Sequence, residues 1–241
     1  MKTALVSLLG LCIFSLPVIG QQKPSPEAEA FYKRAMAGIN KKHVSWVKES
    51  AATFNAKQMN AEEAMPMAQS YGANLGSMTE GDIEALAFLV LMEASKSAQE
   101  DIKSIMAHVK AINDAKAKLR EALKKAQQQQ SLTRLQLDSM KWISSRSKAL
   151  ISERNPDGPE RNPDGPEFKR SPTTALKPTK AEVNAMIDEL KQDLDSISKM
   201  GEMESLRLQK AVDRLNKMME TLSNLLKKIK DTEDQIIQNL K

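Results

Sequence analysis

Apolar residues return every three or four positions along two long stretches of this sequence. Such spacing places them on one face of an α-helix, and over several heptads it is typical of a coiled coil. Apart from Lys116, the first stripe is apolar: Ile102, Ile105, Val109, Ile112, Leu119 and Leu123. The second stripe contains Ile187, Leu190, Leu194, Ile197, Leu208, Val212, Leu215, Met219, Leu222, Leu226, Ile229, Ile236 and Leu240. Two long amphipathic helices are therefore predicted.

The composition favours helices throughout. The 241 residues include only 9 glycines and 4% aromatic residues, whereas 28% are charged. Sheets need turn glycines and favour aromatic residues, so this balance predicts an all-α fold. Eleven residues separate Ile197 from Leu208, which predicts a stutter in the second stripe near Gly201.

The first 20 residues have the pattern of a cleaved secretory signal peptide. Lys2 supplies a positive start, residues 4–16 form a short apolar run, and Gly20 is a small residue at the expected cleavage point. We therefore expect export to the periplasm or the extracellular space of a bacterium. Cleavage removes Cys12, the one cysteine, so the mature chain has no disulfide. An uncleaved anchor and a lipoprotein modified at Cys12 are the alternatives.

Five segments follow along the chain: the signal peptide (1–20), N-terminal helices with a loop (21–78), a long helical arm (79–153), a Pro-rich loop (154–178) and a long C-terminal helix (179–241). The Pro-rich loop contains the sequence RNPDGPE twice in tandem.

Within the first helical segment we expect one helix over about 26–57, a short helix that starts at a capping box of Asn60 and Glu63, and a loop over 70–77. A second capping box, of Thr179 and Glu182, is expected to start the C-terminal helix. The apolar run at 86–92 is expected to be the most buried part of the protein. Whether the glutamines at 127–130 continue the arm is left open. The predicted fold is a long antiparallel, coiled-coil-like hairpin with shorter helices packed on one end.

Residues for catalysis are not evident in the sequence. The two histidines, His43 and His108, have no neighbouring metal-ligand spacing, and phosphate-binding loops and nucleophile motifs are absent. We therefore expect a non-enzymatic protein without catalytic residues, metal or cofactor. The formal net charge of +5 arises from interspersed charges, which argues against nucleic acid as the partner.

Two functional hypotheses remain. In the first, a stripe that the hairpin leaves uncovered recruits another copy or a protein partner. The candidate assembly surface lies near the C-terminus and comprises Leu222, Leu226, Ile229, Ile236, Ile237 and Leu240. Methionines in the same helix, such as Met203, either fill the core or provide an adaptable binding surface.

In the second hypothesis, basic clusters bind an anionic membrane or envelope surface. One cluster comprises Lys227, Lys228 and Lys230, and the other Arg134, Lys141, Arg146 and Lys148. Acidic residues such as Asp231 and Glu233 lie close to the first cluster, which favours a solvated face there over a binding surface.

Two segments resemble a known class of proteins. The sequence SMTEGDIEALAFLVLMEASKSAQEDIKSIM, at 77–106, joins an acidic cap to a strongly apolar helix and then a heptad helix, and KIKDTEDQIIQNLK ends the chain. Together they resemble the helical filament, needle and translocator-associated proteins of bacterial type III secretion. The resemblance implies assembly through a long helical hairpin. The signal peptide departs from that family, so we apply the resemblance to helical assembly and not to the secretion route.

Overall fold

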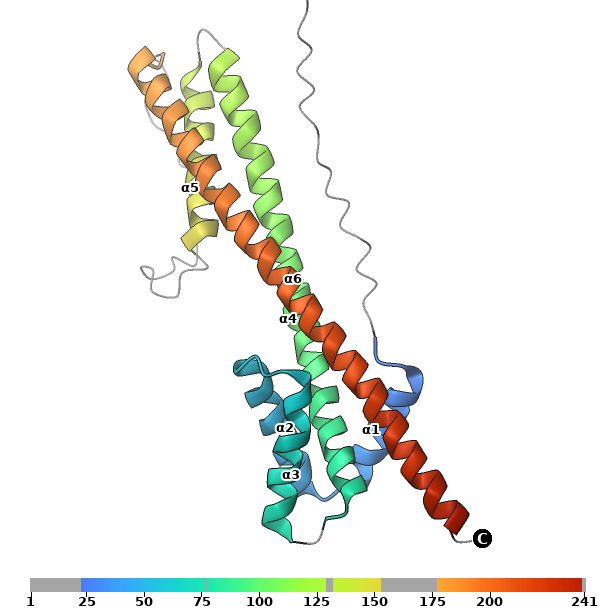
Figure 1. Ribbon diagram of the computed structural model, residues 1–241. Helices are drawn as coiled ribbons and strands as arrows, with labels where there is room; N and C mark the ends of the chain where they lie inside the picture. Colours follow the sequence, from blue (N-terminus) through green and yellow to red (C-terminus); the bar gives the residue numbers. More distant parts are fainter. Residues whose placement is uncertain (1–22, 77, 129–131, 153–176, 240–241) are drawn as a thin grey trace, which may run out of the picture. The chain divides into compact units, whose positions relative to one another are not determined.

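The computed structural model describes residues 23–76, 78–128, 132–152 and 177–239, excluding the side chains of 233–239 (Figure 1). These residues form six α-helices and one short 3₁₀ turn, with no strand among them. The all-α prediction is confirmed. The predicted signal peptide and the tandem repeat lie outside the described residues.

The helix expected over about 26–57 is two helices, α1 (Pro26–Gly38) and α2 (Lys41–Ala56), so that prediction was wrong. Ile39 is extended, and the Asn40 side chain accepts a hydrogen bond from the backbone N–H of Lys42 at 3.0 Å. Asn40 is therefore an N-cap that starts a new helix immediately after Gly38, a weak helix former.

A capping box at Asn60 and Glu63 starts the turn η1 (Ala61–Glu63), and α3 (Ala64–Leu75) follows. The prediction of a loop over 70–77 was wrong for residues 70–75, because they belong to α3. Gly72 is buried in this helix, where an added Cβ would lie 3.2 Å from Ile83. Its missing side chain lets α3 approach the following helix closely. Gly76 ends α3 in the left-handed conformation, with φ +69°.

The arm expected over 79–153 is also divided, into α4 (Glu80–Gln128) and α5 (Arg134–Ser152). Thr79 caps α4, and Thr133 caps α5 through a reciprocal pair of hydrogen bonds with Gln136. This second capping box explains why a new helix starts after the glutamines. The helix α6 (Lys180–Asn239) begins at the predicted capping box of Thr179 and Glu182.

The contacts divide the chain into two compact units. Unit 1 contains the described residues up to Glu93 and those from Asn216 onward, and unit 2 contains Ala94–Leu215. In unit 1, residues 86–92 of α4 are all buried and form the longest unbroken buried run among the described residues, which confirms that prediction. Phe88 lies among them and packs edge-on against Phe31 of α1, with ring centroids 5.0 Å apart.

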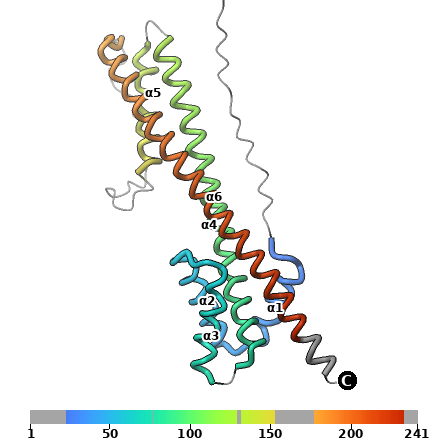
Figure 2. Tube along the Cα trace, in the orientation of Figure 1, coloured from blue at the N-terminus to red at the C-terminus, as the bar shows by residue number. Residues whose placement is uncertain are grey.

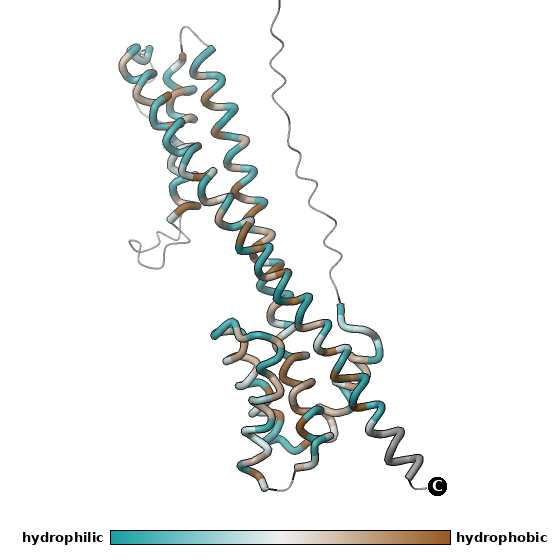
Figure 3. Tube along the Cα trace, in the orientation of Figure 1, coloured by the Kyte–Doolittle hydropathy of each residue, from teal (hydrophilic) through white to brown (hydrophobic). Residues whose placement is uncertain are grey.

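Unit 2 contains the rest of α4, all of α5 and the first part of α6 (Figures 1 and 2). Helix α4 packs against α6, and α5 contributes Leu137 and Met140 to the same core as Leu119 of α4 and Leu190 of α6. Hydrophobic residues alternate with hydrophilic ones along these helices, whereas α4 in unit 1 has a dense hydrophobic run (Figure 3). The core of unit 2 is therefore built from apolar residues spaced along three helices and not from one continuous apolar run.

Candidate interaction surfaces

The C-terminal stripe is largely used inside unit 1. Leu222, Leu226 and Ile229 are buried, with exposed fractions of 2%, 7% and 6%. Nearby, Lys230 forms an ion pair with Glu27 of α1 at 2.6 Å, which ties this part of α6 to the N-terminal helix. The structure thus brings three of the six predicted residues together, but in an intramolecular core. Ile236, Ile237 and Leu240 lie outside the described side chains.

Large exposed apolar side chains occur instead in unit 2. Met203 and Leu206 are 70% and 54% exposed, and they lie three residues apart on one face of α6. Met106 of α4 and Leu135 of α5 are 41% and 49% exposed. The other methionines considered on α6, which are Met200, Met218 and Met219, are buried and fill the core. Met203 was therefore identified by residue type, but its exposure required the structure.

The seam between α4 and α6 contains a buried charge that the apolar pattern did not reveal. Glu204 is 5% exposed, and its Oε2 lies 3.6 Å from Nδ1 of His108. Beside it, Gly201 faces Ile112, whose Cγ2 would lie 3.2 Å from an added Cβ. Gly201 and Glu204 fill the gap between Ile197 and Leu208 at steps of four, three and four residues. This spacing was the feature of the sequence that could have assigned Gly201 and Glu204 to the contact between α4 and α6.

A second polar group joins α5 to α6. Oγ of Ser144 lies 2.6 Å from Oδ2 of Asp193 and 3.0 Å from Oε1 of Glu189. Nζ of Lys148 forms an ion pair with Glu189 and lies 3.8 Å from Oδ1 of Asp193. We call Ser144, Lys148, Glu189 and Asp193 the α5–α6 polar cluster. Asp193 and Ser144 are buried, so the cluster penetrates the helix interface.

The α5–α6 polar cluster has the residue types of a serine–lysine nucleophile pair but not its electrostatics. The hydrogen bond with Glu189 raises the pKa of Lys148, so its ammonium group remains protonated at neutral pH. The same bond lowers the pKa of Glu189 against the opposing effect of partial burial. A lysine held protonated cannot act as a general base for Ser144. The cluster is therefore suited to holding helices together.

Some residues of both basic clusters form ion pairs with carboxylates of the same chain. Arg134 binds Glu182 at 2.7 Å, and this hydrogen bond raises the pKa of Arg134. Lys148 and Lys230 are committed to carboxylates as described above. The exposed cations that remain in the two clusters include Lys141 and Arg146 on α5 and Lys227 and Lys228 on α6. The surface available to an anionic partner is smaller than the sequence suggested.

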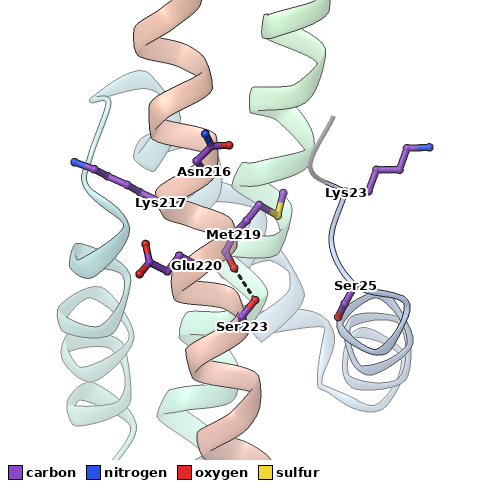
Figure 4. A pocket seen from close by; sticks show the side chains of 7 residues that line it. All are labelled: Lys23, Ser25, Asn216, Lys217, Met219, Glu220 and Ser223. Atoms are coloured by element: carbon purple, nitrogen blue, oxygen red, sulfur yellow. Dashed lines mark hydrogen bonds between the residues drawn. The ribbon is translucent and has the colours of Figure 1, made fainter. Parts of the chain in front are cut away.

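A surface hollow of about 510 Å³ lies beside the start of α1 in unit 1 (Figure 4). Its polar side chains have local functions: Oγ of Ser25 caps α1 by accepting from Ala28, and Oγ of Ser223 donates to the carbonyl of Met219. Lys217 and Glu220 bring opposite charges to its lining. This arrangement does not define a ligand class.

His43, the other histidine, belongs to an aromatic group between α2 and α3. Its Nδ1 lies 3.0 Å from the hydroxyl of Tyr71, and Trp46 stacks on the Tyr71 ring at a centroid distance of 4.1 Å. These contacts give His43 a packing role. In the described part of the chain, no group of three or more histidine, cysteine or acidic residues is placed to hold a metal ion.

Among the described helices, none is both long and apolar enough to cross a membrane. Comparisons with family models, curated proteins and solved structures give no match to this chain.

Proposed function

We propose that this chain is an exported, non-enzymatic bacterial protein that acts by binding another helical protein. The partner that we propose first is a second copy of the same chain. The observation that carries the proposal is the exposed pair Met203 and Leu206 on α6. Removing apolar surface from water contributes about 25 cal/mol per Å², so two large exposed side chains on one helix face favour association.

The scaffold of this proposal is an antiparallel, coiled-coil-like hairpin formed by α4 and α6. Three pairs in unit 2 support it, because residue numbers rise along α4 as they fall along α6. The pairs are Asp101 with Arg214, His108 with Glu204, and Ile112 with Gly201. In such a hairpin each helix buries one stripe and presents its other faces outward.

The proposed function shares helical assembly with the type III filament and translocator-type proteins that the sequence resembles. The proposed export route differs from theirs. The predicted signal peptide supports export by a general secretory route. Within the predicted C-terminal surface, Ile236, Ile237 and Leu240 remain candidates for contact with another chain. Leu222, Leu226 and Ile229 already serve the core of unit 1.

The test is the absolute mass of the mature protein, residues 21–241, measured by light scattering over a concentration series. We expect a dimer or larger species that dissociates on dilution. Replacing both Met203 and Leu206 by lysine should yield the monomer. The matched control replaces both Met106 and Leu135 by lysine, which adds the same two charges at exposed apolar positions of α4 and α5 and should leave association unchanged. A monomeric wild type at every concentration would contradict self-association.

A second candidate function is binding to an anionic envelope surface, favoured by the exposed Lys227 and Lys228 of α6. Cosedimentation with anionic vesicles at low salt, lost at high salt, is the expected result for this function. Binding that survives replacement of both lysines by glutamine would exclude this site.

A further inference from the structure

Helix α5 fully buries only two large apolar side chains among its 19 residues. Its buried positions are Leu137 and Met140 in the first half, and Ser144 and Ser147 in the second half. Ile143, Leu150 and Ile151 pack against the core while only partly buried. Serine contributes little to hydrophobic stabilisation, so the second half of α5 depends on other interactions.

Polar contacts supply that attachment. The α5–α6 polar cluster joins the second half of α5 to Glu189 and Asp193, and the Arg134–Glu182 pair joins its start. In each ion pair the cation lies on α5 and the carboxylate on α6. The side-chain charges that lower the pKa of Glu189 come from Lys148 and Lys141, both on α5. The interface is therefore complementary in charge and sensitive to salt.

Helix α5 covers part of the second apolar stripe, which is a different face of α6 from the exposed Met203 and Leu206. Its Leu137 and Met140 share one core with Met186 and Leu190 of α6 and with apolar residues of α4. Figure 1 shows α5 running alongside both helices in unit 2. If α5 moves away, these apolar side chains of the α4–α6 pair become accessible.

We propose that the α5–α6 polar cluster is an electrostatic latch that holds α5 over the apolar face of the α4–α6 pair. Releasing the latch frees α5 while α4 and α6 stay helical, and it opens this face to a second copy of the chain. The self-association step rests on the function proposed above. The latch itself is a property of one chain and is tested separately.

The experiment is hydrogen exchange of the full mature protein, followed by mass spectrometry of peptides from each helix. Lys148→Glu places a third carboxylate beside Glu189 and Asp193, so we expect about tenfold faster exchange in α5. The exchange of α1, α2 and α3 should not change. Raising the salt concentration should accelerate α5 exchange in the wild type in the same selective way.

Two variants make the result specific. Combining Lys148→Glu with Glu189→Lys exchanges the charges of the pair and should restore the protection of α5. Arg146→Glu makes an equal charge change at an exposed position of the same helix and should leave α5 protected. Unchanged exchange in Lys148→Glu, equal acceleration of α5 and α6, or an equal effect of Arg146→Glu would each overturn the latch.

Light scattering on the same samples separates the two proposals. Faster α5 exchange with a higher mass supports both the latch and association through the uncovered face. Faster α5 exchange without a change in mass supports the latch and contradicts association at this face.

Discussion

The two units use different means to hold helices together. Six aromatic residues lie among the described positions of unit 1, whereas Trp142 is the one aromatic residue among those of unit 2. Among the described residues, unit 2 buries five polar side chains, including Ser144, Asp193 and Glu204, whereas unit 1 buries two, Ser50 and Glu84. Tight apolar packing stabilises one arrangement strongly, whereas polar contacts specify a register with a smaller gain in stability. We therefore expect a helix to separate from its neighbours more readily in unit 2 than in unit 1.

The largest effect should come from the core of unit 1. Replacing Phe88 by alanine removes a buried ring that packs against Phe31, and we expect the free energy of unfolding to fall by about 3–5 kcal/mol. Urea unfolding followed by the fluorescence of Trp46, in a Trp142→Phe background, measures this change. A loss below about 1 kcal/mol would mean that unit 1 does not depend on this packing.

Glu204 tests whether unit 2 gives up stability for specificity. Replacing it by leucine should raise the free energy of unfolding by about 1–2 kcal/mol, because a buried charge is exchanged for apolar contact. Unfolding followed by Trp142, in a Trp46→Phe background, provides the measurement. Glu202→Leu, at an exposed position of the same helix, is the control and should change stability by less than about 0.5 kcal/mol. Destabilisation by Glu204→Leu would show that the His108 contact is a net source of stability.

Two glycines compare the units at single positions. Gly38→Ala, at the last residue of α1 in unit 1, meets no atom within 4 Å and should stabilise by about 0.4–1 kcal/mol, because alanine lowers the entropy of the unfolded chain. Gly201→Ala in unit 2 crowds Cγ2 of Ile112, so its gain should appear only when Ile112→Leu, which has no methyl group at that position, is added. Thermal unfolding of the three variants tests this. An equal increase in stability for both single variants would mean that α4 and α6 move apart at Gly201 with little loss of stability.

The smallest effect concerns the first turn of α6. Hydrogen bonds from Thr179 and Arg134 lower the pKa of Glu182 from 4.5 to about 2. A carboxyl group with a depressed pKa stabilises the folded form above its ordinary pKa, and this contribution is lost as the pH falls from about 4.5 toward 2. The protection factors of the amides in the first turns of α6, which are corrected for the intrinsic pH dependence of exchange, should fall as the pH is lowered through that range, and Glu182→Gln should remove this fall. Identical profiles for both proteins would contradict it.

Local signals predicted the elements better than their packing. The capping boxes at Asn60 and Thr179 and the apolar run at 86–92 were recognised from residue types at short spacing. The break at Asn40 was missed because apolar periodicity continued across a competing cap. Glu204 was missed because an apolar pattern cannot identify a buried charge whose partner lies on another helix. The exposure of Met203 likewise depends on which neighbours cover it.

The ion pair between Glu27 and Lys230 joins residues 203 positions apart in the sequence. Unit 1 thus takes its helices from both ends of the chain, and residues 86–92 are made long before the α6 residues that share their unit. During synthesis, the apolar segment 86–92 lacks the α6 residues of unit 1 until more than 120 further residues have been made. Such a nascent chain needs protection from aggregation until its last helix emerges.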